Sequence, residues 1–252
     1  MVKKLKIFNN FNIPGKFKKS IILIGNFDGL HSGHQKLFEL AKKYKTKYKS
    51  KVGVVTFDPI PKMFFNTKIK NYRISNFNQK VIYLKKFGVD FVINKKFDKN
   101  FSKITYYQFI KNILSKKLRS KFIFVSNNFR FGHKREGDVA VLKKFENDFS
   151  YNLINPKPLM KNKKIISSTI IRKLLEEGKL SKANTFLKRN WEIEGKVQRG
   201  RMMGQKIGFP TCNIDIGNYV IAKPGVYAVK TRINDRRKFY KGIANLGYRS
   251  IT

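Results

Sequence analysis

The chain has 252 residues, more than one compact domain usually contains, so we expect one large domain or two of modest size. Hydrophobic residues make up 41% and aromatic residues 14% of it, which supplies a buried core and excludes a chain that is disordered throughout. The formal net charge of +41 suits substrates that carry phosphates, but the lysines are spread along the whole chain without a zinc-finger or RNA-binding signature. We therefore expect no specific nucleic-acid partner, and keep a basic nucleic-acid-binding protein as an alternative.

The sequence also predicts a cellular location. Its single cysteine, Cys212, excludes an internal disulfide and fits a reducing compartment. Unbroken apolar stretches such as Ile21–Ile24 have the length of a strand and are far short of a membrane span, and the N-terminus lacks a signal-peptide core. These features predict a cytoplasmic protein that does not associate with a membrane, and they leave its oligomeric state open.

From residue 21 to residue 188, short apolar runs alternate with segments of helical periodicity, a pattern typical of a parallel sheet with crossover helices. The predicted strands are Ile21–Gly25, Val52–Phe57, Val89–Ile93, Phe122–Val125 and Tyr151–Ile154. The predicted helices are Gln35–Tyr48, Asn78–Phe87, Tyr106–Leu118, Asp138–Glu146, Thr169–Glu177 and Ser181–Lys188. This part of the chain is therefore expected to be an α/β domain.

The pattern changes after Arg189. Apolar and polar residues alternate in Trp191–Val197 and Val226–Ile233, and glycines recur between these two segments. Such alternation is typical of antiparallel β-structure with one solvated face. We therefore expect two domains, an α/β domain at residues 1–188 and a partial antiparallel β-barrel at residues 189–252.

The first candidate site is the segment Gly25–His34, which joins a predicted strand to a predicted helix. Its glycines let a ligand approach the backbone closely, and the N-terminus of a helix attracts phosphate through free N–H groups and the helix dipole. His31 and His34 are three residues apart, so both imidazoles can point the same way and donate hydrogen bonds to a phosphoryl group. The alternatives are a metal site or two capping histidines, but with only His133 and Cys212 to add, a zinc centre is disfavoured.

The second candidate segment starts the helix predicted at Thr169–Glu177. Ser168 and Thr169 carry hydroxyls that can cap free N–H groups at the helix start, and Arg172 stands one turn further on. A guanidinium suits the β- and γ-phosphates that leave as pyrophosphate. An ordinary capped helix is the alternative, and the histidine loop elsewhere in the chain favours a phosphate clamp.

These two segments resemble the nucleotidyltransferase superfamily, which adenylylates or cytidylylates small phosphorylated substrates. Three further stretches narrow the resemblance to the prokaryotic bifunctional riboflavin kinase/FMN adenylyltransferase (FAD synthetase) family. They are Thr56-Phe57-Asp58-Pro59, Asn128-Phe129-Arg130-Phe131-Gly132 and the glycine-rich run Gly195–Asn213. One departure is Ile60, which stands where the family usually has a histidine, and it implies a lower rate through the loss of one hydrogen-bonding side chain.

The resemblance implies a Rossmann-like domain that makes FAD and pyrophosphate from FMN and ATP. His31, His34 and Arg172 would be catalytic, the histidines at the α-phosphate and the arginine at the departing phosphates. The nucleotide would be bound by Gly25, Phe27, Asp28, Gly33, Ser168 and Thr169. Asn128, Phe129 and Gly132 would help to hold the flavin or the adenine. Transfer of an adenylyl or cytidylyl group to another phosphorylated small molecule is the alternative, which the Asn128–Gly132 stretch disfavours.

The C-terminal segment resembles the riboflavin kinase module, in which ATP phosphorylates riboflavin. The resemblance implies a kinase-like site of Gly204, Gly208, Thr211 and Asn213, with Thr211 and Asn213 as oxygen ligands of Mg²⁺. Residues two apart on a strand face the same side, which would let these two side chains meet one ion. In the family the catalytic base lies in a part of the module that follows the segment matched by the residues up to Thr252. We therefore expect that this chain, as written, does not phosphorylate riboflavin.

Overall fold

The computed structural model describes residues 5–161, 164–198, 208, 211–234 and 238–247. The chain divides into two compact units, the first of residues 1–70 and 77–167 and the second of residues 71–76 and 168–252. The sequence predicts a different division, with a single boundary after residue 188, and that boundary stays a prediction.

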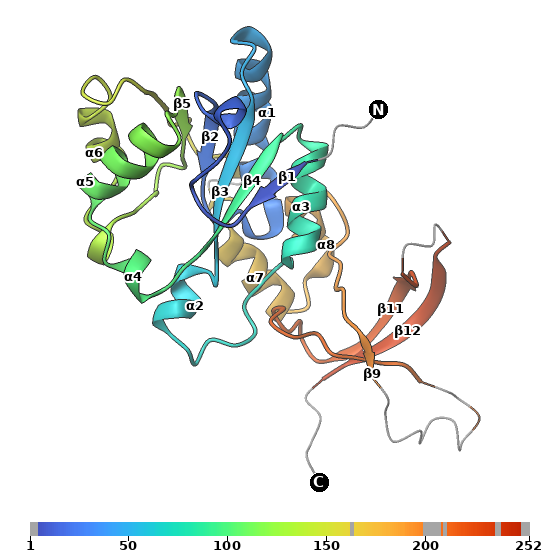
Figure 1. Cartoon of the computed structure of the whole chain (residues 1–252). Coiled ribbons are helices and arrows are strands. Elements are labelled where there is room, and N and C mark those ends of the chain that lie inside the picture. Colours follow the sequence, from blue (N-terminus) through green and yellow to red (C-terminus); the bar gives the residue numbers. More distant parts are fainter. Residues whose placement is uncertain (1–4, 162–163, 199–207, 209–210, 235–237, 248–252) are drawn as a thin grey trace. The chain divides into compact units, whose positions relative to one another are not determined.

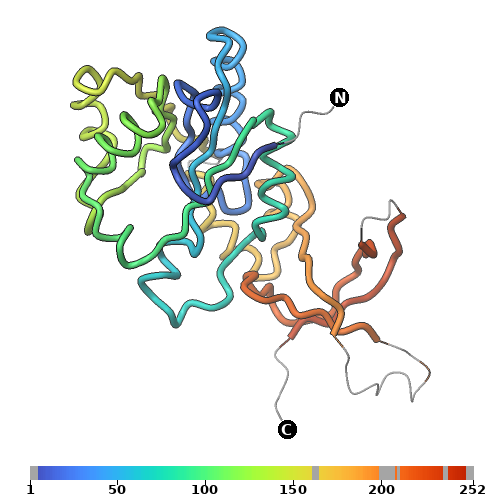
Figure 2. The backbone as a smooth tube through the Cα atoms, in the orientation of Figure 1, coloured from blue at the N-terminus to red at the C-terminus, as the bar shows by residue number. Residues whose placement is uncertain are grey.

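A six-stranded parallel sheet forms the centre of the first unit (Figure 1). Its strands, in spatial order, are β1 (Lys6–Phe8), β4 (Phe91–Lys96), β3 (Val52–Asp58), β2 (Ile21–Ile24), β5 (Phe122–Phe124) and β6 (Asn152–Ile154). The five predicted strands are confirmed with bounds that shift by three residues at most. The edge strand β1 was not predicted, because it is only three residues long and pairs with β4 alone, far along the chain (Figure 2).

Helices cover both faces of the sheet. Ile21 and Leu23 of β2 face one hydrophobic cluster with α1 (Ser32–Lys47) and α3 (Phe77–Lys86). Ile22 and Ile24 face another cluster, which contains side chains of the helix Phe109–Lys117 and of α6 (Val139–Lys144). Because both faces of β2 are covered, all four of its residues are buried, as is usual for a strand within a parallel sheet.

The helix predicted at Tyr106–Leu118 begins as α5 (Tyr106–Gln108) and continues as a π-helix over Phe109–Lys117. Several short elements were not predicted. They are α2 (Pro61–Phe65), α4 (Lys99–Ser102), the hairpin of β7 (Met160–Lys161) with β8 (Lys164–Ile165), and the 3₁₀ turns η1 (Gly15–Phe17), η2 (Asp28–Leu30) and η4 (His133–Arg135). None of the helices in the described part of the chain has the length and hydrophobicity needed to span a bilayer.

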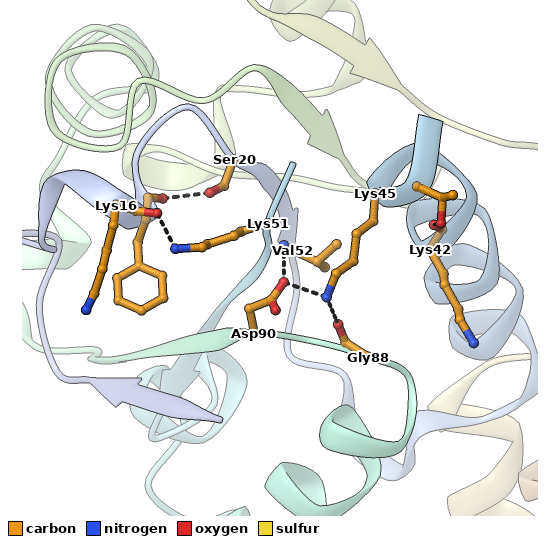
Figure 3. A network of polar contacts seen from close by, with 10 residues as sticks. Lys16, Ser20, Lys42, Lys45, Lys51, Val52, Gly88 and Asp90 are labelled. Atoms are coloured by element: carbon orange, nitrogen blue, oxygen red, sulfur yellow. Dashed lines mark hydrogen bonds and ion pairs between the residues drawn. The ribbon is translucent and has the colours of Figure 1, made fainter. Parts of the chain in front are cut away.

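A half-buried carboxylate, that of Asp90, joins three elements at the end of the sheet where β2 and β3 begin (Figure 3). The Asp90 side chain accepts hydrogen bonds from the Val52 backbone N–H at 2.8 Å and from the Lys45 ammonium at 2.7 Å. Lys45 also donates to the Gly88 carbonyl at 2.7 Å. The end of α1, the turn before β4 and the start of β3 are thereby held together.

The second unit combines two helices with small antiparallel sheets. Helices α7 (Ser168–Glu176) and α8 (Leu180–Leu187) pack around a core that includes Leu175 and Leu187. The antiparallel strands are β9 (Val197–Gln198) with β10 (Asn213–Ile214), and β11 (Gly225–Thr231) with β12 (Tyr240–Leu246). The predicted antiparallel β-structure after residue 189 is therefore confirmed.

The strand predicted at Trp191–Val197 is wrong for all but its last residue. The Trp191 backbone N–H donates to the Asn184 side chain at 2.7 Å, and its indole N–H donates to the Ile74 carbonyl at 2.9 Å. These bonds attach the start of the segment to α8 and to residues 71–76. A strand forms only from Val197 onward.

Candidate functional site

The candidate motifs of the first unit lie in loops at the same end of the central sheet. Because β2, β3 and β5 are parallel neighbours, the loops that follow them all start at their carboxyl ends. Strand β3, which follows β2 in the chain, lies on one side of β2 in the sheet, and β5 lies on its other side. The strand order therefore reverses at β2. Ligands of open α/β sheets bind in the crevice at such a point. The topology therefore groups the histidine loop, the Asp58–Pro59 turn and the segment around Asn128.

The histidine loop, Gly25–His34, has an unusual backbone. Phe27, Gly29 and Leu30 have φ angles of 46°, 75° and 39°, in the left-handed region that costs energy for residues other than glycine. The Phe27 ring is buried, with its centroid 5.2 Å from the His34 ring and 5.0 Å from the Phe38 ring. This packing against α1 stabilises the turn.

The two histidines lie at the N-terminus of α1 and stack on each other. Their ring centroids are 3.7 Å apart with an interplanar angle of 24°. His31 is the N-cap of the helix, and its Nδ1 accepts a hydrogen bond from the His34 backbone N–H at 3.4 Å. A neutral His31 must therefore carry its proton on Nε2. Gly33 makes room for this arrangement, because a Cβ there would lie 3.1 Å from His31 Nδ1.

Electrostatics favour the neutral form of His34. Burial, the neighbouring His31 and the ammonium of Lys80 together hold the pKa of His34 well below its usual value of 6.5. The ring is thus an uncharged imidazole at neutral pH, with one N–H donor. Its Nδ1 is buried without a hydrogen-bond partner among the residues that the structure describes.

Within the described part of the chain, two more buried polar atoms of this loop have no hydrogen-bond partner. They are Asn26 Oδ1 and Ser32 Oγ. Buried polar groups normally have partners, so three such atoms in nine residues point to a ligand or ordered water at the start of α1. Asp28 is also buried here, at 3% exposure. The hydroxyl of Ser32 and the imidazole of His34 can donate hydrogen bonds to the oxygen atoms of a phosphate, whereas Asn26 Oδ1 can accept one from an N–H or O–H group of a ligand or water.

Lys80 is a residue of this site that the sequence analysis missed. It projects from α3 at only 2% exposure, and its ammonium donates to the Asn26 carbonyl at 2.8 Å and to Thr56 Oγ1 at 3.2 Å. In a chain with 56 lysines and arginines, no local pattern distinguishes one buried lysine from the exposed ones.

An aromatic cavity of about 130 Å³ follows β3 and β5. Phe129, Phe131 and Gly132 of the predicted flavin segment line it, together with Phe57 and Phe101. Phe129 and Phe131 stack at 5.4 Å, and basic side chains at the rim add positive charge: Arg130, Lys134 and Arg135. The cavity is smaller than the roughly 300–1,000 Å³ of most ligand pockets, but Phe65 on its wall is 68% exposed and has room to move.

The other residues of this region have local roles. Asn128 is exposed, and its side chain accepts a hydrogen bond from Ser126 at 2.9 Å. Gly132 has a φ of 79°, and a Cβ there would lie 2.7 Å from the Tyr106 backbone nitrogen, so only glycine fits. Ile60 is buried and precedes α2, where its carbonyl accepts from Met63 at 2.8 Å.

The second candidate segment belongs to the second unit. Ser168 begins α7, Thr169 is exposed on the same helix, and Arg172 is 7% exposed. The Arg172 guanidinium lies 3.6 Å from the Tyr72 ring centroid, and its Nε donates to the Tyr72 carbonyl at 2.7 Å. Tyr72 thus fixes Arg172, a role that no motif indicated. That Ser168, Thr169 and Arg172 act with the histidine loop stays a prediction.

Of the kinase-like residues, Gly204 lies outside the described residues. Gly208 is exposed with a φ of 80°, Thr211 is exposed, and Asn213 is half-buried in β10 opposite Gln198. A hydroxyl and an amide oxygen are ligand types that suit Mg²⁺. Their convergence on one ion stays a prediction, because Thr211 precedes the strand. Among the described residues, no three histidine, cysteine, aspartate or glutamate side chains are grouped as a metal site.

Comparison with known proteins gives concordant matches over both units. The family model described as FAD synthetase matches residues 14–170, and the one described as riboflavin kinase matches residues 187–252. The bifunctional riboflavin kinase/FMN adenylyltransferase of Buchnera aphidicola subsp. Acyrthosiphon pisum (strain APS) is 39% identical over 236 residues, which are 94% of this chain and 75% of that protein. The protein of the same description from Escherichia coli (strain K12) is 35% identical over 229 residues, 91% of this chain and 73% of that protein.

A solved structure has the same fold. The crystal structure of a macrolide-efflux protein from Streptococcus pneumoniae superposes with a TM-score of 0.81 and 29% sequence identity. The match covers 96% of this chain and 78% of that chain.

Proposed function

The chain belongs to the bifunctional riboflavin kinase/FMN adenylyltransferase family, and on this premise we propose that its histidine loop transfers the adenylyl group of ATP to FMN. A phosphate oxygen of FMN attacks the α-phosphorus of ATP. The bond from that phosphorus to the bridging oxygen breaks, and FAD and pyrophosphate are the products. The chain is thus a transferase of FAD biosynthesis whose substrates are ATP and FMN.

The observation that carries this proposal is the stacked pair of histidines at the N-terminus of α1. Negative charge grows on the α-phosphoryl oxygens in the transition state, and preorganised N–H donors stabilise that charge. His34 is held neutral, so it donates one N–H without a change of charge, and His31 donates from Nε2 when neutral. The free backbone N–H groups and the dipole of the 16-residue helix α1 act in the same direction. Gly25, Phe27, Asp28 and Gly33 would bind the nucleotide around this pair.

The aromatic cavity supports FMN as the acceptor. A flavin ring is planar and apolar enough to lie against Phe129 and Phe131, and the rim offers positive charge to its phosphate. Gly132 keeps the wall free of a side chain, and the exposed Asn128, which precedes Phe129 in the chain, would bond the ring or the adenine. This chemistry favours FMN over a phosphorylated substrate without a ring system.

Arg172 would bind the departing pyrophosphate with Ser168 and Thr169. An arginine whose Nε is bonded and whose plane is stacked loses little entropy when its terminal N–H groups bind phosphate. A clamp on the leaving group lowers the barrier by neutralising its charge as the bond breaks.

The second unit would carry the riboflavin kinase site. Thr211 and Asn213 would hold Mg²⁺ there, with Gly204 and Gly208 leaving the backbone accessible to ATP. Bound Mg²⁺ would neutralise charge on the phosphates of ATP. The family match at residues 187–252 supports the site, and whether this chain converts riboflavin to FMN is measured by supplying riboflavin and ATP.

We also propose that the protein acts in the cytoplasm on small molecules, without a specific nucleic-acid partner. The single cysteine and the phosphorylated substrates support this proposal. Binding to nucleic acid that is sequence-selective and persists at high salt would contradict it, because a charge of +41 alone gives binding that salt abolishes.

The main proposal is tested with ATP that carries a radioactive label at the α-phosphate. With FMN and Mg²⁺, the label should appear in FAD and unlabelled pyrophosphate should be released. Riboflavin in place of FMN, CTP in place of ATP, and phosphorylated compounds that lack a flavin serve as controls. Transfer of the label to such a compound at a kcat/KM equal to that for FMN would contradict the assignment of FMN.

A further inference from the structure

Lys80, Asn26 and Thr56 form a closed polar triangle beneath the histidine loop. The Lys80 ammonium lies 2.8 Å from the Asn26 carbonyl oxygen and 3.2 Å from Thr56 Oγ1. Thr56 Oγ1 in turn donates to the Asn26 carbonyl at 3.3 Å. The triangle joins three separate elements: helix α3, strand β3, and the loop that follows β2. Helix α3 also packs against the turn η2 within this loop.

A lysine is a costly choice for this position. Moving an ammonium out of water has a large desolvation penalty, even in a protein that relaxes around it. Packing alone would favour an apolar residue, such as Leu84 one turn further along α3, which is also fully buried. Lys80 is nearly as buried as Leu84, and it places an ammonium next to the loop instead of an apolar group. A positive charge therefore stands at the base of the candidate phosphate site.

The loop above Lys80 needs such a support. Phe27 and Leu30 are non-glycine residues in the left-handed region, a backbone conformation that is strained unless surrounding contacts compensate. The Asn26 carbonyl that Lys80 binds immediately precedes this strained turn. The turn in turn sets where α1 begins, and hence where His31 and His34 lie.

We propose that Lys80 is a positioning residue of adenylyl transfer, whose ammonium holds the Asn26–Leu30 turn onto β3 and thereby fixes the imidazoles of His31 and His34. The inference rests on the proposed function of the histidine loop, and it adds to that loop a residue from a different element, helix α3. The groups that act electrostatically on the His34 ring are His31, from the same loop, and Lys80, from α3. Both lower the pKa of His34, so Lys80 also helps to keep this imidazole neutral.

The test compares Lys80→Met with Lys85→Met. Methionine nearly preserves the volume of the buried side chain, and Lys85 is an exposed lysine of the same helix, so both variants lose one charge from α3. We expect Lys80→Met to lower kcat for FAD formation roughly 10- to 100-fold with little change in KM, because misplaced catalytic groups impair the transition state. Lys85→Met should leave kcat unchanged.

An NMR titration of the histidine side chains gives a readout that a purely structural role would not move. In Lys80→Met the pKa of His34 should rise toward its usual value, and the acid limb of the kcat profile should move to higher pH with it. In Lys85→Met neither should move. Normal kcat together with an unchanged His34 titration in folded Lys80→Met would overturn the proposal, even if that variant is less stable.

Thr56→Val provides a second variant that keeps the lysine and nearly the same shape. It removes one corner of the triangle, so amide exchange at Phe27–Leu30 should accelerate and kcat should fall by less than in Lys80→Met. If the two substitutions act through one contact network, the double variant should be no slower than Lys80→Met alone, and strictly multiplied effects would overturn the proposal. Amide exchange and the His34 titration need no substrate, so they test Lys80 even if the wild-type chain makes no FAD.

Discussion

Replacing Gly33 with alanine should impair catalysis without unfolding the protein. A Cβ at this position would lie 3.1 Å from His31 Nδ1, 3.2 Å from His31 Cε1 and 3.3 Å from the Ile166 carbonyl oxygen. Ordinary contacts to carbon lie at about 3.5–4.0 Å, so the His31 ring must shift by several tenths of an ångström. If a displacement of 1 Å costs about 100-fold in rate, this smaller one should lower kcat roughly 10-fold.

Stability should change little in this variant. Gly33 lies in the first turn of α1 and its φ is not positive, so alanine fits the backbone. An alanine in such a position usually adds about 0.4–1 kcal/mol by restricting the unfolded chain, which offsets part of the new contact strain. We expect the free energy of unfolding to stay within about 1 kcal/mol of the wild-type value.

The assay is the steady-state rate of FAD formation, measured with the Tm of each variant. Gly15→Ala is the matched control, because nothing lies within 4 Å of a Cβ at Gly15. The effect should disappear in a His31→Ala background, where no ring is left to displace. An undiminished kcat in folded Gly33→Ala, or an equal further loss in the His31→Ala background, would refute the reasoning.

Three further predictions concern the clamp, the pH dependence and the fold. Tyr72→Leu should raise the KM for ATP about 2- to 30-fold by removing a cation–π contact to Arg172 worth about 0.5–2 kcal/mol, and Tyr72→Phe should not. The pKa of His34 is lower in the folded chain than in the unfolded chain, so the unfolded chain binds a proton first as the solution is acidified. The free energy of unfolding should therefore fall as pH drops below about 6.5, and it should fall less steeply in His34→Gln. Asp90→Ala leaves the Val52 N–H without its acceptor and should cost about 1.5–3 kcal/mol, seen as a Tm lower by roughly 3–12 °C, whereas exposed Asp148→Ala should change Tm by less than about 2 °C.

The core strands were predictable because the pattern of their own side chains is enough to identify them. Ile21–Ile24 is apolar at every position, which a strand within a parallel sheet requires, and the helix after it has a clear apolar stripe. The edge strand Lys6–Phe8 gave no such signal, since its residues are not covered on both faces. Trp191–Val197 alternates correctly for a strand, yet tertiary hydrogen bonds to Asn184 and Ile74 decide its conformation.

The residues of the candidate site likewise fall into those that the sequence could predict and those that it could not. His31, His34 and Gly33 were predictable because their spacing and their place before a helix follow from local geometry. Lys80 and Tyr72 act through contacts with residues far along the chain, to Asn26 and to Arg172. Nothing in their immediate neighbours distinguishes a buried lysine or a stacked tyrosine from an exposed one.

The central claim is that the histidine pair stabilises the transition state of adenylyl transfer, and the steady-state kinetics of His34→Ala test it most directly. Removing one such donor should lower kcat for FAD formation about 10²- to 10³-fold while the KM for ATP changes little. Glu39→Ala, an exposed position further along α1, should keep the wild-type values. A folded His34→Ala variant with wild-type kcat would contradict the account, as would a loss that lies wholly in KM.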